Sequence, residues 1–266
     1  MPSSEFTTTT TAELAERIDR AHGRFAALLR EVPDDTVVDR TWTAGQVVGH
    51  LTSVVNRYTA FAPERLGATP RAVDAINARE VEEWSGRPLA DALDALDGEM
   101  DAFRRLWGPE GGIPLDQPVP FHAGGTIDVQ AALTNLLGEY LVHGLDVADA
   151  VGVAWDIDAR DGALLATFGT QVLPFYAKPD APPLVVRFDL EGMEPWVLSV
   201  DGSNTSTRPP QPGDDPDVVL QGPAGLVPLL FYGRLDLAGA ETRGLRVAGG
   251  THPERAVTLT DRFESP

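Results

Sequence analysis

Glu139 and His143 have the residue types and the spacing of a metal-binding pair. They lie four positions apart in an apolar stretch that is predicted to be helical, so their side chains project from one face. Asn135 lies one turn before this pair and Asp146 one turn after it, on the same face. A carboxylate and an imidazole placed in this way supply two convergent ligands for a divalent cation.

A third ligand would complete the site, and His50, on another predicted helix, is our candidate. Buried polar groups need partners, and one shared cation would satisfy all three side chains. His122, in a Gly/Pro-rich segment, is the competing candidate. For His50 and His143 the alternative is a structural role without metal, and Glu139 with His143 could be an ordinary i,i+4 pair of a helix surface. For His122 the alternative is a loop histidine near the surface. His22 and His252 are expected to be solvated.

The three ligands, two histidines and one carboxylate, leave a coordination position open. This favours a catalytic site over a structural one. Zinc is our first choice, and non-haem iron, nickel and manganese fit the same ligands. Asn135 and Asp146 are candidates for residues that hold the ligands in place. For Asp146, the alternative is a polar residue near the helix end.

Composition excludes several classes of function. The formal net charge of −19 disfavours nucleic acid and anionic membranes as partners. Because the chain contains no cysteine, any thiol chemistry must use a small-molecule thiol.

The N-terminus has neither the basic start nor the apolar core of a signal peptide, and no apolar run reaches membrane-spanning length. We therefore expect a cytoplasmic protein. The sequence motifs of serine hydrolases, zincin proteases and nucleotide-binding enzymes are absent.

Apolar periodicity predicts a helix bundle in the first part of the chain. Thr43 and Gln46 have the spacing of a capping box that opens the second helix. The threonine run at 7–11 is expected to be frayed, with its last members capping the first helix. The Gly/Pro-rich stretch 109–125 is predicted to be irregular or a short hairpin, and no other strand is expected before residue 150. The predicted helices cover residues 12–30, 44–61, 70–84 and 89–107, and a further helix, opened by Thr126 or Asp128, carries Glu139.

The pattern changes after residue 154. A helix at 158–175 is followed by strand signals at 184–190, 196–200, 217–220 and 245–248. Residues 203–215 are predicted to form a loop and residues 225–232 a short apolar helix. The fold class is therefore α+β, with a four-helix bundle over residues 1–154 and a smaller α+β domain over residues 155–266.

Three short motifs resemble the mycothiol-dependent maleylpyruvate isomerase family, which lies within the DinB-like metal-binding bundle superfamily. They are Trp42-Thr43, His50-Leu51 and the Glu-x-x-x-His-Gly-x-Asp pattern that ends at Asp146. The second half is similar to the sterol-carrier-like domain often appended in this family. That similarity rests on the segments 217–220 and 233–236.

The resemblance implies that His50, Glu139 and His143 are catalytic ligands of a divalent metal, usually zinc, and that mycothiol is the thiol cosubstrate. A metal-activated thiolate can add to an electrophilic double bond, which allows rotation and then elimination; the same adduct, kept or displaced, gives S-transfer. Arg79 matches an arginine that holds a substrate carboxylate. Arg234 is a weaker candidate for substrate binding, and its alternative is a surface ion pair.

The resulting hypothesis is a metal-dependent, mycothiol-using transferase or isomerase. Its partners would be a low-molecular-weight thiol and a small electrophilic substrate, which could carry a carboxylate. Nucleic acid and membranes are not expected as partners. The chain would be a monomer or a small homo-oligomer. Two alternatives stay open, namely a metal-dependent hydrolase and a non-catalytic protein that binds or sequesters a small molecule.

Overall fold

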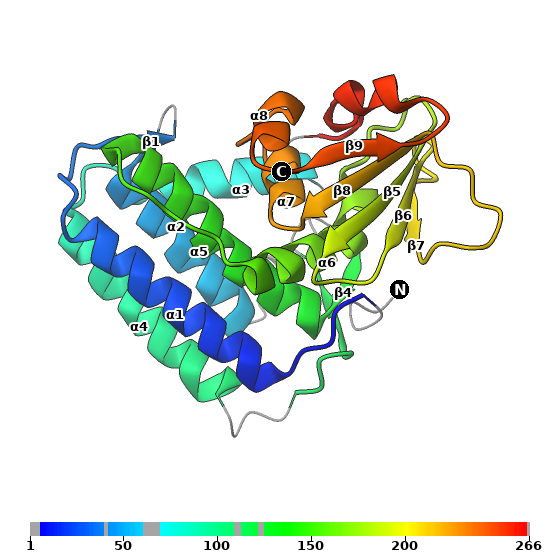
Figure 1. Cartoon of the computed structure of the whole chain (residues 1–266). Coiled ribbons are helices and arrows are strands. Elements are labelled where there is room, and N and C mark those ends of the chain that lie inside the picture. The colour runs from blue at the N-terminus through cyan, green and yellow to red at the C-terminus, as the bar shows by residue number, and fades with distance from the viewer. Residues whose placement is uncertain (1–5, 40–41, 61–69, 109–112, 122–124, 265–266) are drawn as a thin grey trace. The chain divides into compact units, whose positions relative to one another are not determined.

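A computed structural model describes residues 6–39, 42–60, 70–108, 113–121 and 125–264 (Figure 1). The chain forms two compact units. The helical unit is Thr9–Asp156, and the sheet unit joins Ile157–Pro266 to the residues that precede Thr9. The predicted domain boundary after residue 154 stays a prediction, because contacts define compact units and do not show that each unit folds alone.

Helices α1, α2, α4 and α5 pack together in the helical unit, as expected for a bundle (Figure 1). Helix α5 is buried on almost every side, which agrees with an interior position. The shorter α3 packs against α2. The helices are α1 (Thr11–Leu29), α2 (Ala44–Ala60), α3 (Pro70–Glu82), α4 (Leu89–Trp107) and α5 (Val129–Val151).

Two short antiparallel strand pairs lead into α2 and α5. β1 (Val37–Asp39) pairs with β2 (Trp42–Thr43), and β3 (Pro118–Pro120) pairs with β4 (Thr126–Asp128). The second pair is the short hairpin that the sequence offered as one alternative. The first pair was not expected, and the prediction of no strand there was wrong. Two or three residues are too few to show an alternating apolar pattern.

Side-chain caps fix where α2 and α5 begin. The backbone N–H of Thr43 donates to Gln46 Oε1 at 2.9 Å, and the N–H of Gln46 donates to Thr43 Oγ1 at 3.4 Å. This pair of bonds is the predicted capping box. At the start of α5, Asp128 Oδ1 accepts from the N–H of Ala131 at 2.7 Å, so of the two predicted caps Asp128 is the one used.

A buried ion pair holds α3 against α2. The guanidinium of Arg57, only 1% exposed, donates to the carboxylate of Glu80, which is also buried, and to Asn77 Oδ1 at 2.8 Å. Removing one partner of such a pair would leave an uncompensated buried charge. The sequence did not predict this pair, because its two members lie in different helices.

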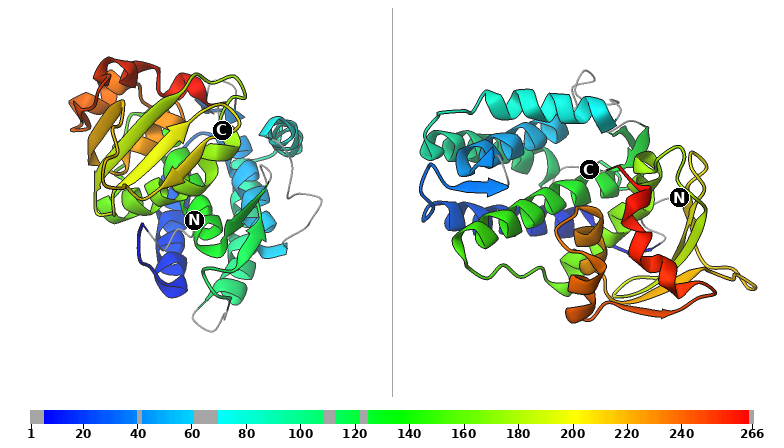
Figure 2. Two further views of the ribbon diagram at one scale, coloured as in Figure 1. Left: turned by 90° about the vertical axis from the view of Figure 1, so that its right-hand side faces the viewer. Right: turned by 90° about the horizontal axis from the view of Figure 1, so that it is seen from above.

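The sheet unit contains a five-stranded sheet in the order β7-β6-β5-β8-β9. β5 and β8 are parallel, and the other neighbours are antiparallel. Helix α6 packs against β5, β6 and β7 (Figure 2). Alternate residues of β5 are buried. The elements are α6 (Ala159–Tyr176), β5 (Leu184–Glu191), β6 (Trp196–Val200), β7 (Ser206–Arg208), β8 (Val218–Pro223), α7 (Leu226–Phe231), α8 (Leu237–Thr242) and β9 (Arg246–Gly249).

The structure confirms the α+β class and adds features that the sequence did not reveal. β7 lies inside the stretch predicted to be a loop, and α8 was not expected. The predicted fraying of the threonine run was wrong at Thr7, which is 5% exposed and whose hydroxyl lies 2.7 Å from Thr167 Oγ1. Phe6 is also buried within the sheet unit. The cap at Thr10 is as predicted, because its side chain accepts from the N–H of Glu13.

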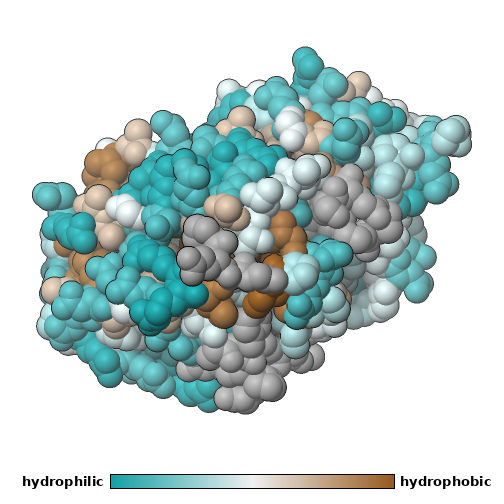
Figure 3. Space-filling view, turned by 90° about the horizontal axis from the view of Figure 1, so that it is seen from below, coloured by the Kyte–Doolittle hydropathy of each residue, from teal (hydrophilic) through white to brown (hydrophobic). Residues whose placement is uncertain are grey.

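Few large hydrophobic side chains are exposed in the part of the chain that the structure describes; they are Val37, Val153 and Val257. On the face drawn in Figure 3, hydrophobic residues form small separate spots among hydrophilic ones. None of the described helices is both long enough and apolar enough to cross a bilayer.

Gly144 tests how closely α5 is packed beside its histidine. A Cβ at Gly144 would lie 2.1 Å from Cζ2 of Trp155, and the Nε1–H of Trp155 donates to the carbonyl of Leu141 at 2.9 Å. Gly144→Ala should therefore lower the free energy of unfolding by about 1–3 kcal/mol, measured by urea denaturation followed by circular dichroism.

Gly23→Ala is the matched control, because Gly23 is exposed within α1 and no atom lies within 4 Å of the added Cβ. This change should raise the free energy of unfolding by about 0.5–1 kcal/mol. Equal stability of Gly144→Ala and the unchanged protein would contradict the close packing of Trp155.

Candidate metal centre

His50 from α2 and the pair Glu139 and His143 from α5 meet inside the helical unit. The Nε2 atom of His50 lies 3.3 Å from Glu139 Oε2, and the Nε2 atom of His143 lies 3.4 Å from the same oxygen. One ligand atom from each residue lies within 4.8 Å of the other two. Within the described residues this is the only such group of histidine and acidic side chains. The structure thus brings together the three residues that the sequence singled out.

All three side chains are shielded from solvent. His50 is 4% exposed and His143 is 8% exposed, and the side chain of Glu139 retains 18%. Burial lowers the pKa of His50, and the hydrogen bond to Glu139 offsets this only in part. Burial alone would raise the pKa of Glu139. Hydrogen bonds from His143 and His50 outweigh burial and hold that pKa well below its usual range.

Asp146 acts on His143 from the other side of the ring. The Nδ1–H of His143 donates to Asp146 Oδ2 at 3.2 Å. Burial alone would lower the pKa of His143, but the hydrogen bonds to Asp146 and Glu139 outweigh burial and raise it to about 9. At neutral pH the site therefore holds a carboxylate at Glu139, an imidazolium at His143 and a neutral imidazole at His50.

Asn135 lies where the sequence placed it, one turn before Glu139. Its Nδ2 donates to the hydroxyl of Tyr58 at 2.8 Å and lies 3.5 Å from Glu139 Oε1. Asn135 is 3% exposed and Tyr58 is 2% exposed. These side chains extend the polar contacts between α2 and α5 beyond the three clustered residues. Tyr58 was expected only as part of the apolar face of α2.

Trp42 covers the two histidine rings. Its ring centroid lies 5.2 Å from that of His50 and 6.1 Å from that of His143, and the two histidine rings are 5.2 Å apart. These separations are typical of packed aromatic pairs. The sequence identified Trp42 only as part of a family motif, and its contact with the histidines was missed because eight residues separate it from His50.

The other candidates are not among the three clustered residues. Arg79 is exposed on α3, and Arg234 donates to the carbonyl of Tyr232 at 2.8 Å within the sheet unit. Their substrate-binding roles remain predictions. His122 falls outside the described residues. His252 is exposed as expected, whereas the prediction for His22 was wrong, since it is 4% exposed and its Nε2 lies 2.9 Å from Asp97 Oδ1.

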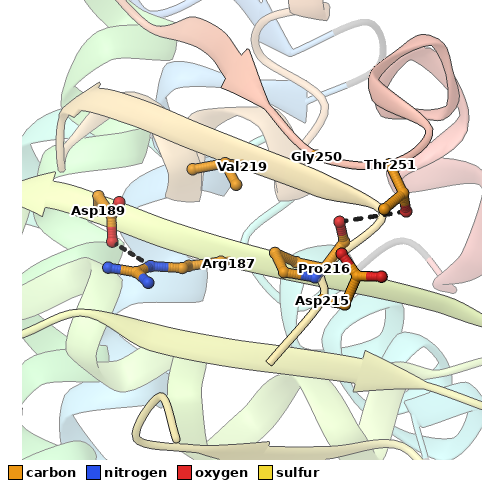
Figure 4. Close-up of a pocket in the computed structure, with 7 residues that line it drawn as sticks. All are labelled: Arg187, Asp189, Asp215, Pro216, Val219, Gly250 and Thr251. Carbon is orange, nitrogen blue, oxygen red and sulfur yellow. Dashed lines mark hydrogen bonds and ion pairs between the residues drawn. The ribbon is translucent and has the colours of Figure 1, made fainter. Parts of the chain in front are cut away.

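A separate pocket of about 450 Å³ lies in the sheet unit (Figure 4). It contains an arginine that is already paired, because Arg187 Nε donates to Asp189 Oδ1 at 2.7 Å. The pocket contains none of the clustered metal-ligand side chains. Its lining residues are Arg187, Asp189, Asp215, Pro216, Val219, Gly250 and Thr251.

The clustered residues fit a divalent cation. Two imidazole nitrogens and one carboxylate oxygen are the donor types that zinc and related metals take in catalytic sites. The half-buried carboxylate of Glu139 already needs positive charge beside it, which in this structure the imidazolium of His143 provides. A cation bound between the same three atoms would supply that charge instead.

Comparison with known proteins identifies the family of the helical unit. The family model described as "Mycothiol maleylpyruvate isomerase N-terminal domain" matches residues 15–148, slightly more than half of the chain. The chain belongs to the mycothiol maleylpyruvate isomerase family. The matched region contains His50, Glu139 and His143, so the candidate metal centre lies inside the family domain.

Two solved structures support the family fold over nearly the whole chain. A crystal structure of the mycothiol-dependent maleylpyruvate isomerase has 13% sequence identity and a TM-score of 0.55, and the match covers 91% of this chain and 94% of that chain. A histidine-to-alanine mutant of that isomerase matches with 14% identity, a TM-score of 0.54 and the same coverage. At this identity the likeness shows the fold alone. No curated protein matches the chain.

Metal binding to this isomerase-family site should release a proton. Because the pKa of His143 is about 9, its ring is protonated at pH 6–8 and must lose a proton before it can bind a metal. The apparent affinity for Zn²⁺ should therefore rise with pH, by about tenfold per pH unit. Calorimetric titrations in buffers of different ionisation enthalpy would measure the number of protons released.

The variant Asp146→Asn tests whether Asp146 causes the raised pKa of His143. It removes the carboxylate that raises the pKa of His143, so fewer protons should be released and the affinity should depend less steeply on pH. His252→Ala, which changes an exposed histidine, should leave both quantities unchanged. An affinity for Zn²⁺ that does not vary between pH 6 and 8 would show that His143 carries no proton to displace.

Proposed function

We propose that this chain is a metal-dependent enzyme that uses mycothiol to isomerise a small electrophilic substrate or to transfer the thiol to it. The observation that carries the proposal is the convergence of His50, Glu139 and His143 within 4.8 Å of one another, in a buried position inside the family domain. The absence of cysteine fits a thiol that arrives as a separate molecule. The family model is named for mycothiol, and one structure with the same fold is described as a mycothiol-dependent maleylpyruvate isomerase.

The three clustered residues would hold the metal, and zinc is the first choice. Three protein ligands are typical of catalytic zinc sites, which keep a position for an external ligand. A divalent cation supplies a positive charge that lowers the pKa of a coordinated thiol and so raises its thiolate fraction at neutral pH. The same ligands also suit iron, nickel and manganese.

The chain's other side chains would orient these ligands and bind the substrate. The carboxylate of Asp146 accepts a hydrogen bond from the Nδ1–H of His143. This bond fixes the orientation of the ring and makes its Nε2 atom a stronger metal ligand. Asn135 lies beside the second oxygen of Glu139. Arg79 offers a planar guanidinium that suits a carboxylate, and we propose it as the substrate-binding residue if the substrate is carboxylated. Arg234 is the second candidate for this role.

Elemental analysis tests the metal site. The purified protein should contain about one equivalent of zinc, and His50→Ala should lower the affinity for zinc by more than about 100-fold, beyond the loss typical of an outer residue. Activity with mycothiol should fall with metal content. His252→Ala is the matched histidine control and should keep the metal. Full metal content in His50→Ala would exclude His50 as a ligand.

Omission of the thiol tests the reaction class. With a panel of substrates that carry activated double bonds, turnover should require mycothiol, because the chain has no thiol of its own. Equal turnover without mycothiol would indicate a metal-dependent hydrolase in place of a thiol-using enzyme. Binding of the same compounds without any chemistry, in the metal-loaded protein with thiol present, would support sequestration.

A further inference from the structure

The two histidines of the metal centre are held in different ways. His143 donates its Nδ1–H to the carboxylate of Asp146 at 3.2 Å. The Nδ1 atom of His50 is buried and has no hydrogen-bond partner among the residues that the structure describes. The Nε2 atoms of both rings face Glu139. Within the described part of the chain, the ring of His50 therefore has no outer hydrogen bond like the one that fixes the ring of His143.

This difference matters for a metal ligand. A neutral imidazole that binds a metal through Nε2 carries its proton on Nδ1, and ligating histidines almost always donate that proton to a carboxylate, carbonyl or water. Without such an acceptor, a ring can turn about its side-chain torsion and lose the orientation that coordination requires. Packing against neighbouring groups must then supply the orientation of His50.

Trp42 is placed to supply that packing. Its ring centroid lies 5.2 Å from that of His50, with an angle of 47° between the ring planes. The side chain of Trp42 is half-buried, and His50 is 4% exposed. The backbone of Trp42 is itself fixed. It pairs with Asp39 in the β1–β2 ladder, and the capping box begins at the next residue, Thr43. The indole therefore covers His50 from a backbone that strand pairing and the capping box hold in place.

We propose that Trp42 is the positioning residue of His50 and takes the place of the missing outer hydrogen bond. This inference rests on the proposed metal centre. The indole limits the rotation of the His50 ring and keeps its Nε2 directed at Glu139, while Asp146 does the same for His143. Each histidine of the site then has one residue that holds it, one by ring packing and one by a hydrogen bond.

Metal affinity measured by competition with a chelator tests the proposal. Trp42→Leu, which keeps an apolar side chain but removes the ring, should lower the affinity for Co²⁺ by about tenfold or more, as typical for residues that orient a ligand. Trp42→Phe keeps an aromatic ring and should retain most of the affinity. Trp196→Phe changes a tryptophan of the sheet unit that stacks on Phe188, outside the helical unit that carries the three ligands, and should have no effect on affinity. Circular dichroism would check that each variant is folded.

A double-mutant cycle shows whether Trp42 acts through His50. In a His50→Ala background, Trp42→Leu should cause no further loss of affinity, whereas Asp146→Asn should still cause its own loss. Cu²⁺ would be the metal for this cycle, because it binds nitrogen and oxygen ligands more tightly than Co²⁺ and so reports on a weakened site.

The outcomes separate the two hypotheses. If the unchanged protein binds neither Co²⁺ nor Zn²⁺, the metal centre itself is wrong and the role of Trp42 falls with it. If the unchanged protein binds metal and Trp42→Leu binds equally well, only the positioning role is wrong. A loss in Trp42→Leu that is undiminished in the His50→Ala background would also overturn it, because Trp42 would then act on the site without His50.

Discussion

The half-buried carboxylate of Glu139 is the constraint on which the centre of the helical unit depends. A charged group inside a bundle is stable only when partners compensate its lost hydration. Glu139 lies on α5, a helix that is otherwise buried among apolar side chains, and His50 and His143 supply its partners. Because His50 comes from α2, the compensation of one charge joins two helices that are far apart in the sequence.

The packing around the two histidines shows how closely α2 and α5 are enclosed. Gly49 precedes His50 and Gly144 follows His143, and a Cβ at either glycine would lie 2.1 Å from a tryptophan side chain, Trp84 in the first case and Trp155 in the second. Each helix therefore leaves room for a bulky ring directly beside its histidine. Such close packing restricts small movements of both helices. It therefore keeps the distances among the clustered atoms of His50, Glu139 and His143 nearly constant.

Local sequence patterns predicted the parts of this arrangement that depend on neighbours along the chain. The four-residue spacing of Glu139 and His143, the capping box at Thr43 and Gln46, and the extent of α4 all follow from helix periodicity and cap chemistry, and the structure has each of them. The family motifs at Trp42 and His50 indicated the second helix of the site. These features share one property, namely that a few consecutive residues determine them.

The features that the sequence missed depend on contacts across the fold. His22 looked like a solvated helix residue, but packing of α1 on α5 places its ring 5.5 Å from that of Tyr140. The pairing of Arg57 with Glu80 and the covering of His50 by Trp42 likewise arise only when separate elements meet. β7 is a three-residue strand that pairs with β6 at the edge of the sheet, and so short a segment carries no alternating pattern of its own.

The electrostatics of the three clustered side chains depend on the proton that His143 carries. His143 lies between two carboxylates and has a raised pKa, whereas burial lowers the pKa of His50. The imidazolium of His143 therefore offsets part of the negative charge of Glu139 and Asp146. In the proposed metal centre, a divalent cation held by His50, Glu139 and His143 would supply positive charge in place of that proton. The hydrogen bonds that stabilise Glu139 and His143 in this structure would also hold two of the ligands of the proposed metal centre.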